Sequence, residues 1–307
     1  MTTFTAGKNP VEFDSQSVRL RGNLFLPPGF DPEGTYPGIV VGGTWTSVKE
    51  QMSDRYAERL AEQGFAALDY DFRYYGESGG EPRQYESPIA KMADNRSAIT
   101  FLASLPFVDA QRIGALGICA SAGYMSGTIA NDERVKSLAL VAPWLHNKAL
   151  TYVVYGGEEG VQRRIEVGNA ARQNYEETGE VDYVPACSPT DENAAMYGPF
   201  DFYLNPERGA LPQWTNRFAV MSWPEWLQFD GVQYGEQIRV PTVLVHSEEA
   251  AIPDGARQFY NAVTAPKEFV WTQGTQFDFY DQAPQVTEAI SAITNHFDQT
   301  LRDEQAT

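Results

Sequence analysis

The stretch that most constrains the fold is Arg112–Tyr124, RIGALGICASAGY, in which an apolar run gives way to small residues around Cys119. Ile113–Ile118 has the length and composition of a buried strand, and a helix is expected to begin just after Cys119. Gly117 and Ser121 each lie two positions from Cys119, so small side chains flank the cysteine where two backbone segments must pass closely. The pattern predicts a tight strand-to-helix turn that presents the Cys119 thiol, the arrangement called a nucleophile elbow.

Two other interpretations of this stretch stay open. Ser121 would be the nucleophile if Cys119 took the first glycine position, but the strand would then have to continue through Gly117. We favour Cys119 because Ile113–Ile118 is already a strand of ordinary length and Gly117 falls where the turn needs it. In the other interpretation, Cys119 is a small buried residue packed behind the strand, as free cysteines often are.

Strand and helix patterns alternate on both sides of this turn. Apolar and polar residues alternate in Val11–Phe13 and Val18–Leu26, which predicts an antiparallel hairpin at the sheet edge. Continuous apolar runs predict strands buried on both faces, and amphipathic runs predict the helices between them. The expected strands are Gly38–Val41, Ala66–Phe72, Ser137–Ala142, Thr242–His246 and Glu268–Trp271, and the expected helices are Glu50–Gln63, Pro88–Leu105, Pro253–Val263 and a closing helix with Val286, Ile290, Ile293 and Phe297 on one face. The alternation predicts an α/β fold with a mostly parallel central sheet and helices on both faces.

Between Pro143 and Val240 the strand alternation is lost and helical pieces with many aromatic residues replace it. We interpret 143–240 as an inserted helical cap between two parts of the core, 1–142 and 241–307. Ordinary surface helices with aromatic side chains packed downward are the alternative. Because ligand pockets are mostly apolar and aromatic, the cap interpretation places a substrate cavity beneath this segment.

Charge and cysteine content narrow the choice of partners. A formal net charge of −18 repels phosphate backbones and anionic lipids, so nucleic-acid and membrane partners are not expected. No apolar run reaches membrane-span length and Met1–Asn9 lacks signal-peptide blocks, which predicts a cytoplasmic protein. Cys119 and Cys187 are the only cysteines and the three histidines are far apart, so no metal site, disulfide or other cofactor is predicted. The expected partner is a small-molecule substrate, with homodimer formation left open.

Several motifs resemble a known family. They are Gly42-Gly43 followed by Val48-Lys49-Glu50, Asp71 with Tyr75–Arg83 (YGESGGEPR), Gly117–Ser121 (GICAS) and Phe277–Asp281 (FDFYD). With these motifs the chain resembles, over nearly its whole length, the α/β-hydrolases of the dienelactone-hydrolase-like kind, within the group that includes fungal polyketide transferases. The resemblance implies an α/β-hydrolase fold. In the family pattern the residue before the FDFYD run is the catalytic histidine, and this chain has Gln276 there.

Gln276 changes the expected chemistry, because an amide can donate and accept hydrogen bonds but cannot shuttle protons near neutral pH. A thiol tolerates this loss better than a serine would, since a pKa of ~8.5 leaves some thiolate at neutral pH. The acid of an α/β-hydrolase follows the strand after the cap, which points to Glu248 or Glu249. Glu248 is preferred because it comes first, although two solvated loop charges would look the same. If either glutamate orients the base position, Gln276→His is expected to raise hydrolysis.

The remaining site residues are expected at the carboxyl ends of the strands. Backbone amides of Thr44 and Ala120 are predicted to form the oxyanion hole. The predicted substrate-binding residues are Trp45, Trp144, His146, Tyr197 and Trp223. Of the three histidines only His146 is placed where it could reach the site from the cap, while His246 and His296 are expected to be structural.

The predicted function is cleavage of an ester, thioester or lactone of a bulky apolar acyl group through Cys119. An acyltransferase or cyclase would use the same covalent intermediate. A binding protein that kept the fold and lost turnover is the third reading, and fold alone does not choose among them.

Overall fold

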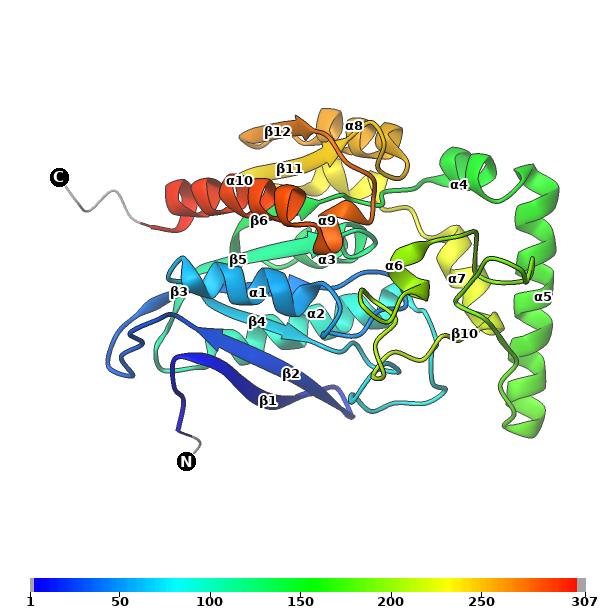
Figure 1. Cartoon of the computed structure of the whole chain (residues 1–307), viewed down its shortest axis with the longest axis horizontal. Helices are drawn as coiled ribbons and strands as arrows, with labels where there is room; N and C mark the ends of the chain where they lie inside the picture. Colours follow the sequence, from blue (N-terminus) through cyan, green and yellow to red (C-terminus); the bar gives the residue numbers. More distant parts are fainter. Residues whose placement is uncertain (1–2, 303–307) are drawn as a thin grey trace.

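The computed structural model describes residues 3–302, whose strands form one central sheet and two small two-stranded sheets (Figure 1). In the central sheet the first three strands in spatial order pair antiparallel with one another, and all the following pairs of neighbouring strands are parallel. The strands, in spatial order, are β1 (Gly7–Ser15), β2 (Val18–Leu26), β4 (Ala66–Tyr70), β3 (Tyr36–Gly42), β5 (Val108–Ile118), β6 (Val135–Val141), β11 (Thr242–Ser247) and β12 (Lys267–Thr272). The predicted mostly parallel α/β sheet with an N-terminal edge hairpin is confirmed.

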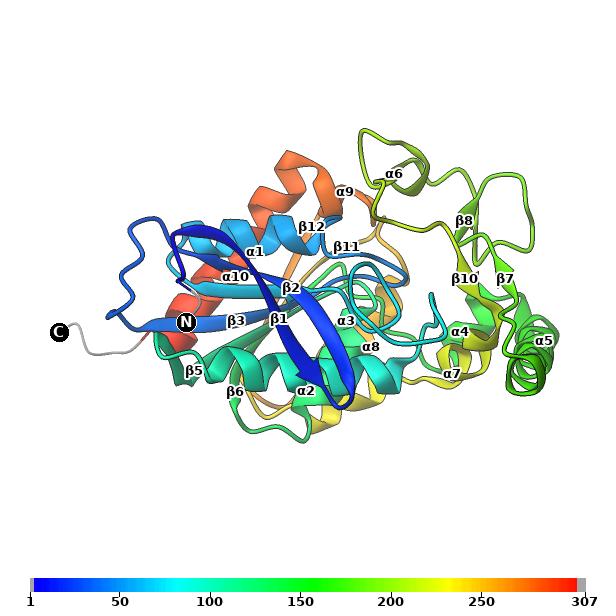
Figure 2. The same cartoon turned by 90° about the horizontal axis from the view of Figure 1, so that it is seen from below.

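Helices cover both faces of this sheet. Figure 2 shows α1 (Ser53–Glu62) and α10 (Ala283–Leu301) above it and α2 (Pro88–Ala103) below it. The helices α3 (Ser121–Ile129) and α8 (Pro253–Ala262) lie on the α2 side. Alternate residues of β3 serve the two layers, because Ile39 and Val41 join the cluster under α1 and α10 whereas Val40 joins the one under α2 and α8. Apolar residues on both faces are what a strand needs when helices cover it on both sides.

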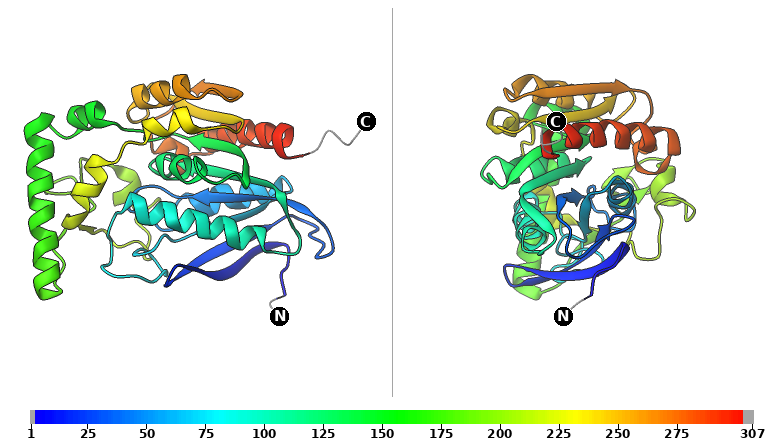
Figure 3. Two further views of the ribbon diagram at one scale, coloured as in Figure 1. Left: turned by 180° about the vertical axis from the view of Figure 1, so that it is seen from behind. Right: turned by 90° about the vertical axis from the view of Figure 1, so that its left-hand side faces the viewer.

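The chain between β6 and β11 contains only short strands and helices, apart from one long helix. That helix, α5, runs across the strand direction at one end of the molecule (Figure 3). The elements are α4 (Lys148–Val154), α5 (Gly157–Thr178), β7 (Tyr183–Val184), β8 (Cys187–Ser188), β9 (Met196–Tyr197), α6 (Asp201–Leu204), β10 (Phe218–Ala219), the 3-10 helix η1 (Val220–Ser222), α7 (Trp223–Gln228) and the 3-10 helix η2 (Val232–Gln237). Its last element, η2, packs on α3 and α8 of the core. The cap boundaries at 143 and 240 therefore stay a prediction.

The aromatic residues of this segment continue the hydrophobic core. Phe218, Trp223 and Trp226 are buried in the same cluster as Trp45 and the side chains of α1 and α10. A remaining short helix, α9 (Asp278–Asp281), precedes α10 and brings Tyr280 into this cluster. Among residues 3–302 no helix is both long and apolar enough to cross a membrane.

Candidate functional site

The turn around Cys119 has the geometry that the sequence predicts. Cys119 has a φ of 55°, a left-handed conformation that a non-glycine residue adopts only where the surrounding structure fixes it. Its amide donates to Val141 at 3.0 Å, and its carbonyl accepts from the Trp144 amide at 2.9 Å. A Cβ at Gly117 would lie 2.6 Å from the Ser121 carbonyl oxygen, so only glycine allows the strand and helix to pass. Strand β5 ends at Ile118 and α3 begins at Ser121, with Cys119 between them.

Ser121 is not presented as a nucleophile. Its side chain is fully buried, and its hydroxyl donates to the Gly43 carbonyl oxygen. It therefore ties the loop after β3 to the first turn of α3. Cys119 instead lines a cavity, and its role as nucleophile stays a prediction.

Two backbone amides face the Cys119 sulfur, those of Ala120 and Trp45. The first belongs to the residue after the nucleophile and the second to the loop after β3, which are the two usual sources of oxyanion-hole donors. In this loop the amide that faces the sulfur is that of Trp45, one residue after the predicted Thr44, and the oxyanion hole itself stays a prediction. Thr44 is buried, and its hydroxyl lies 3.1 Å from the Tyr203 hydroxyl.

The cavity in front of Cys119 has a volume of about 630 Å³. Among the predicted binding residues, Trp45, Trp144 and Tyr197 line it. Aromatic residues of the predicted cap, Tyr155, Tyr203 and Trp226, line it as well, and further apolar side chains complete the wall: Met196, Phe200, Phe277 and Tyr280. A largely aromatic wall of this size suits a bulky apolar group.

The other two predicted binding residues lie behind this wall. His146 is buried, accepts a hydrogen bond from Trp144 Nε1 at 2.9 Å and lies 2.9 Å from the Trp226 carbonyl oxygen. Because a carbonyl only accepts, Nε2 carries the proton, and burial lowers the His146 pKa to about 4. His146 therefore orients Trp144 and supplies no base to the cavity. Trp223 packs against Trp45, Phe218 and Tyr155 without lining the cavity.

The two remaining histidines are also structural. His246 is fully buried on β11 and packs edge-on against Trp271. His296, on α10, is hydrogen-bonded to the Ser137 hydroxyl at 2.8 Å. Burial lowers the pKa of each to about 4. Neither lines the cavity of Cys119.

Gln276 lies beside Cys119 in the position that the family resemblance assigns to the base. Its Oε1 accepts from the Ala251 amide at 3.0 Å, and its Nε2 donates to the Ala142 carbonyl at 2.9 Å and to the Tyr280 hydroxyl at 3.1 Å. A backbone amide only donates and a carbonyl only accepts, so this orientation of the side-chain amide is forced. The side chain thus turns its donor end toward the sulfur and offers no acceptor there.

The predicted acid is not in contact with Gln276. Glu248 is exposed and forms an ion pair with Arg257, whose guanidinium lies 4.4 Å from the Trp271 ring centre. The solvated partner on α8 holds this carboxylate outside the site. Glu249 lines the cavity, yet the group that contacts Gln276 Oε1 is the Ala251 amide. The prediction that Glu248 orients residue 276 is therefore wrong. The loop after β11 instead contacts Gln276 through the backbone amide of Ala251.

Tyr280 supplies a hydroxyl beside the sulfur. Burial raises the pKa of the Cys119 thiol, whereas hydrogen bonds from Tyr280, the Ala120 amide, Gln276 and the Trp45 amide act in the opposite direction, with burial dominating. The sulfur is thus surrounded by donors inside an apolar cavity. Tyr280 belongs to the FDFYD run, and the place of that run directly after Gln276 is the sequence signal that could have identified it.

The buried carboxylate of Glu86 joins the loop after β3 to helix α3 behind the site. Glu86 accepts from the Thr46 amide at 2.9 Å, from Tyr124 at 2.7 Å and from Tyr75 at 3.0 Å. Lys91 pairs with it at 2.7 Å. Thr46 follows Trp45 and Tyr124 lies on α3, so this network fixes the loop after β3 relative to the turn at Cys119. Sequence analysis did not identify Glu86.

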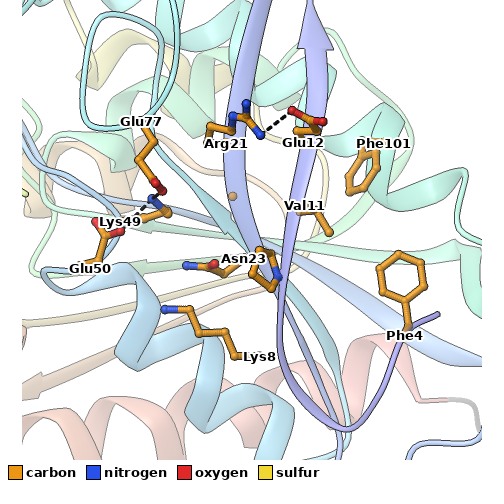
Figure 4. A pocket seen from close by; sticks show the side chains of 12 residues that line it. Phe4, Lys8, Val11, Glu12, Arg21, Asn23, Lys49, Glu50, Glu77 and Phe101 are labelled. Carbon is orange, nitrogen blue, oxygen red and sulfur yellow. Dashed lines mark hydrogen bonds and ion pairs between the residues drawn. The ribbon is translucent and has the colours of Figure 1, made fainter. Parts of the chain in front are cut away.

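A second cavity, of about 870 Å³, lies along the β1–β2 hairpin (Figure 4). Its charged side chains are paired with one another or with neighbours: Arg21 with Glu12, Lys8 with Asp54, and Lys49 with Glu50, Asp71 and Glu77. The Lys49 ammonium thus occupies the centre of a carboxylate group whose spacing would otherwise suit a metal ion. Asp71 also accepts from the Glu77 amide at 2.9 Å, so this cluster shapes the glycine-rich loop at 76–80 and is structural.

Comparison with known proteins agrees with this architecture. The Dienelactone hydrolase family matches residues 22–150. Over nearly the whole length of both chains, the protein is 30% identical to the uncharacterized protein YcjY of Escherichia coli (strain K12), covering 97% of this chain and 98% of YcjY. The chain belongs to the dienelactone hydrolase family of α/β-hydrolases.

Other members of this similarity group carry functional names. The polyketide transferase claH of Penicillium crustosum is 27% identical over 84% of this chain and 86% of its own length. A thiohydrolase of Eupenicillium brefeldianum is 25% identical over 85% of this chain and 84% of its own length. The crystal structure of PA2218 from Pseudomonas aeruginosa superposes with a TM-score of 0.86 at 28% identity, covering 97% of this chain and 95% of that one. The resemblance inferred from the motifs is confirmed, and the protein is a hydrolase-like member of the family.

Proposed function

We propose that this protein cleaves esters, thioesters or lactones of bulky apolar acyl groups through a covalent acyl intermediate on Cys119. The observation that carries the proposal is the Cys119 sulfur at an elbow, facing two backbone amides at the wall of an aromatic cavity. The thiolate attacks the acyl carbonyl, and the amides of Ala120 and Trp45 stabilise the developing alkoxide. Two relatives are named as a polyketide transferase and a thiohydrolase, and these names support acyl chemistry of this kind.

The groups around Cys119 select among these substrates. Among residues 3–302 no histidine lines the cavity, so no described imidazole is placed to protonate a departing alkoxide. A thiolate or an aryl oxide can depart without a proton, whereas an alkyl alkoxide cannot do so readily. Thioesters and aryl esters are therefore the preferred substrates within the proposed class.

Release of the acyl group is expected to be slow with water, because water needs a base to attack the acyl-enzyme. A thiolate or amine acceptor does not depend on such a base to the same degree. This favours acyl transfer as the second candidate function. The cytoplasmic location, the small-molecule partner and any homodimer stay predictions from the sequence.

Incubation with 4-nitrophenyl butyrate and 4-nitrophenyl acetate, followed by intact-protein mass spectrometry, tests the proposal. We expect a butyryl adduct that maps to Cys119, forms faster than the acetyl adduct and is absent in Cys119→Ala. Addition of a small thiol should discharge the adduct faster than buffer alone if acyl transfer is preferred. A protein that binds the esters without adduct or turnover would be a binding protein, and the proposal would fail.

A further inference from the structure

One charged side chain in the wall of the Cys119 cavity has no role in the chemistry proposed above. Arg164, on α5, lines this cavity together with Tyr155 and Trp226. The side chain is partly buried, and burial lowers the pKa of its guanidinium. A cation in a wall made mostly of aromatic and apolar side chains, in a chain with a net charge of −18, calls for a physical reason.

Arg164 has no carboxylate partner in the described part of the chain. Burial lowers the pKa of Arg164 most, the Tyr155 side chain raises it, and the like charge of Arg163 lowers it further. On the same helix, Arg172 by contrast pairs with Glu225 at 3.5 Å. Arg164 is thus a desolvated cation whose compensation within residues 3–302 comes from neutral groups.

Those neutral groups fix the orientation of the guanidinium. Nη1 donates to the carbonyl oxygens of Tyr155 and Gly160, each at 3.0 Å. The guanidinium carbon lies 5.4 Å from the Tyr155 ring centre and 5.5 Å from that of Trp223, within cation–π range. The side chain is therefore held in place before any ligand arrives.

The hydrogen bonds on Nη1 leave the opposite edge of the guanidinium available. Nε and Nη2 donate to no acceptor among the described residues and are not enclosed polar atoms. This edge presents parallel N–H groups, the geometry that binds two oxygens of a carboxylate or phosphate. Glu192 and Glu249 also line the cavity, but neither forms an ion pair with Arg164. An anion is expected at Arg164, because the glutamates disfavour an anion beside them.

We propose that Arg164 binds an anionic oxygen group, carboxylate or phosphate, at the end of an otherwise apolar substrate. This deepens the proposed function, since it assigns a substrate class to the same cavity. A carboxylate would belong to the acyl chain itself, and a phosphate to the carrier from which the acyl group is transferred. Both use the same free edge of the guanidinium.

The test measures binding and not turnover, so its outcome does not depend on Cys119 chemistry. Three unreactive probes share one apolar body: 4-phenylbutyramide, 4-phenylbutyrate and 4-phenylbutyl phosphate. Their affinities for the wild-type chain, Arg164→Gln, Arg164→Lys and Arg163→Gln are measured by calorimetry. Arg163→Gln is the matched control, because it removes a neighbouring positive charge that does not line the Cys119 cavity.

We expect the wild type and Arg163→Gln to bind at least one anionic probe about 10-fold or more tightly than the amide, as charge-assisted hydrogen bonds allow. Arg164→Gln should lose this preference. Its affinity for the amide should stay within about twofold of the wild-type value, a change smaller than the loss of one hydrogen bond would cause. Arg164→Lys keeps the charge without the two-pronged edge and should lose most of the preference. Tighter binding of the carboxylate probe would indicate an anion on the acyl chain, whereas tighter binding of the phosphate probe would indicate an anion on the carrier.

Three results would overturn the inference. The first is equal binding of all probes by the wild type. The second is a preference that survives Arg164→Gln, which would place the anion at the amides of Ala120 and Trp45. The third is an equal loss in Arg163→Gln, which would reflect net charge alone. If Arg164→Gln does not fold, Arg164→Lys and the wild-type comparison still decide the outcome, while a failure of Cys119 acylation leaves this test unaffected.

Discussion

Replacing Gln276 with histidine is expected to restore little hydrolysis on its own. The Ala251 amide donates to Gln276 Oε1 at 3.0 Å, so an imidazole in the same place meets a donor on the side away from Cys119. A neutral imidazole must accept there, which puts its proton on the nitrogen that faces the sulfur. That tautomer cannot take the thiol proton. The sequence alone predicts the larger effect, because it assumes that Glu248 or Glu249 orients the ring.

The missing orienting group sets the size of the effect. Positioned general acid–base catalysis contributes about 10²–10⁴-fold, and loss of the orienting aspartate in a serine protease costs about 10⁴ in kcat. We therefore expect Gln276→His to raise hydrolysis of 4-nitrophenyl butyrate by less than about 10-fold, because a wrongly held imidazole forfeits most of the general-base gain. Adding Ala251→Asp, at the position that contacts residue 276 and is only partly buried, should bring the gain to about 10² or more.

The assay is steady-state release of 4-nitrophenol from each variant, with folding checked by circular dichroism. Ala251→Asn combined with Gln276→His is the matched control, since it has the same shape as the aspartate variant without the charge. It should behave like Gln276→His alone. A single Gln276→His variant that already reaches about 10²-fold, the range of a well-positioned base, would show that Glu248 or Glu249 orients the imidazole and would refute the reasoning.

Three further predictions concern the thiol and its support. Iodoacetamide should label Cys119 before Cys187, because Cys119 lines the cavity whereas Cys187 is 1% exposed and burial raises its pKa to about 11. Peptide mapping after partial alkylation checks the order, and earlier labelling of Cys187 would contradict it. Tyr280→Phe should shift the pH profile of Cys119 alkylation to higher pH, because it removes a donor that favours the thiolate; the loss of one hydrogen bond to a charged group slows labelling at pH 8 by about 10-fold or more. An unshifted profile in a folded variant would mean that Tyr280 does not act on the sulfur. Glu86→Gln should lower the free energy of unfolding by about 3 kcal/mol or more, since it leaves the buried Lys91 without its partner. Urea denaturation measures this, with exposed Glu248→Gln as the control, and equal stability of the two variants would argue against the network's role.

The elbow could be predicted from sequence because its constraints are local. Gly117, Cys119 and Ser121 are adjacent along the chain, and the need for small residues at a sharp turn is independent of the rest of the fold. The alternation of strands and helices was equally readable, since each apolar run reflects burial of that strand on both faces. These features fixed the layers and the place of the site at the carboxyl ends of the strands.

The partners of the site could not be read in the same way, because they depend on contacts between distant segments. Glu248 was preferred for its place after β11, yet Arg257 on the following helix draws its carboxylate outward. The sequence predicts His146 as a cavity residue, but a contact with Trp226, eighty residues away, holds its ring behind the wall. Arg164 gave no signal at all, because an arginine on a long polar helix resembles any solvated charge.

The arrangement around Gln276 suggests why a cysteine, and not a serine, stands at the elbow. Every group identified beside the sulfur is a donor: the amides of Ala120 and Trp45, the Tyr280 hydroxyl and Gln276 Nε2. Donors stabilise an anion but cannot remove a proton, so a serine hydroxyl would stay protonated and inert here. A thiol is acidic enough to lose its proton to solvent without a positioned base, although burial raises the pKa of Cys119 and lowers the fraction of thiolate. In the proposed mechanism, the same donors would stabilise the alkoxide of the tetrahedral intermediate and would leave water unactivated. The proposal therefore predicts that the acyl-enzyme forms and persists until an acceptor more nucleophilic than water arrives.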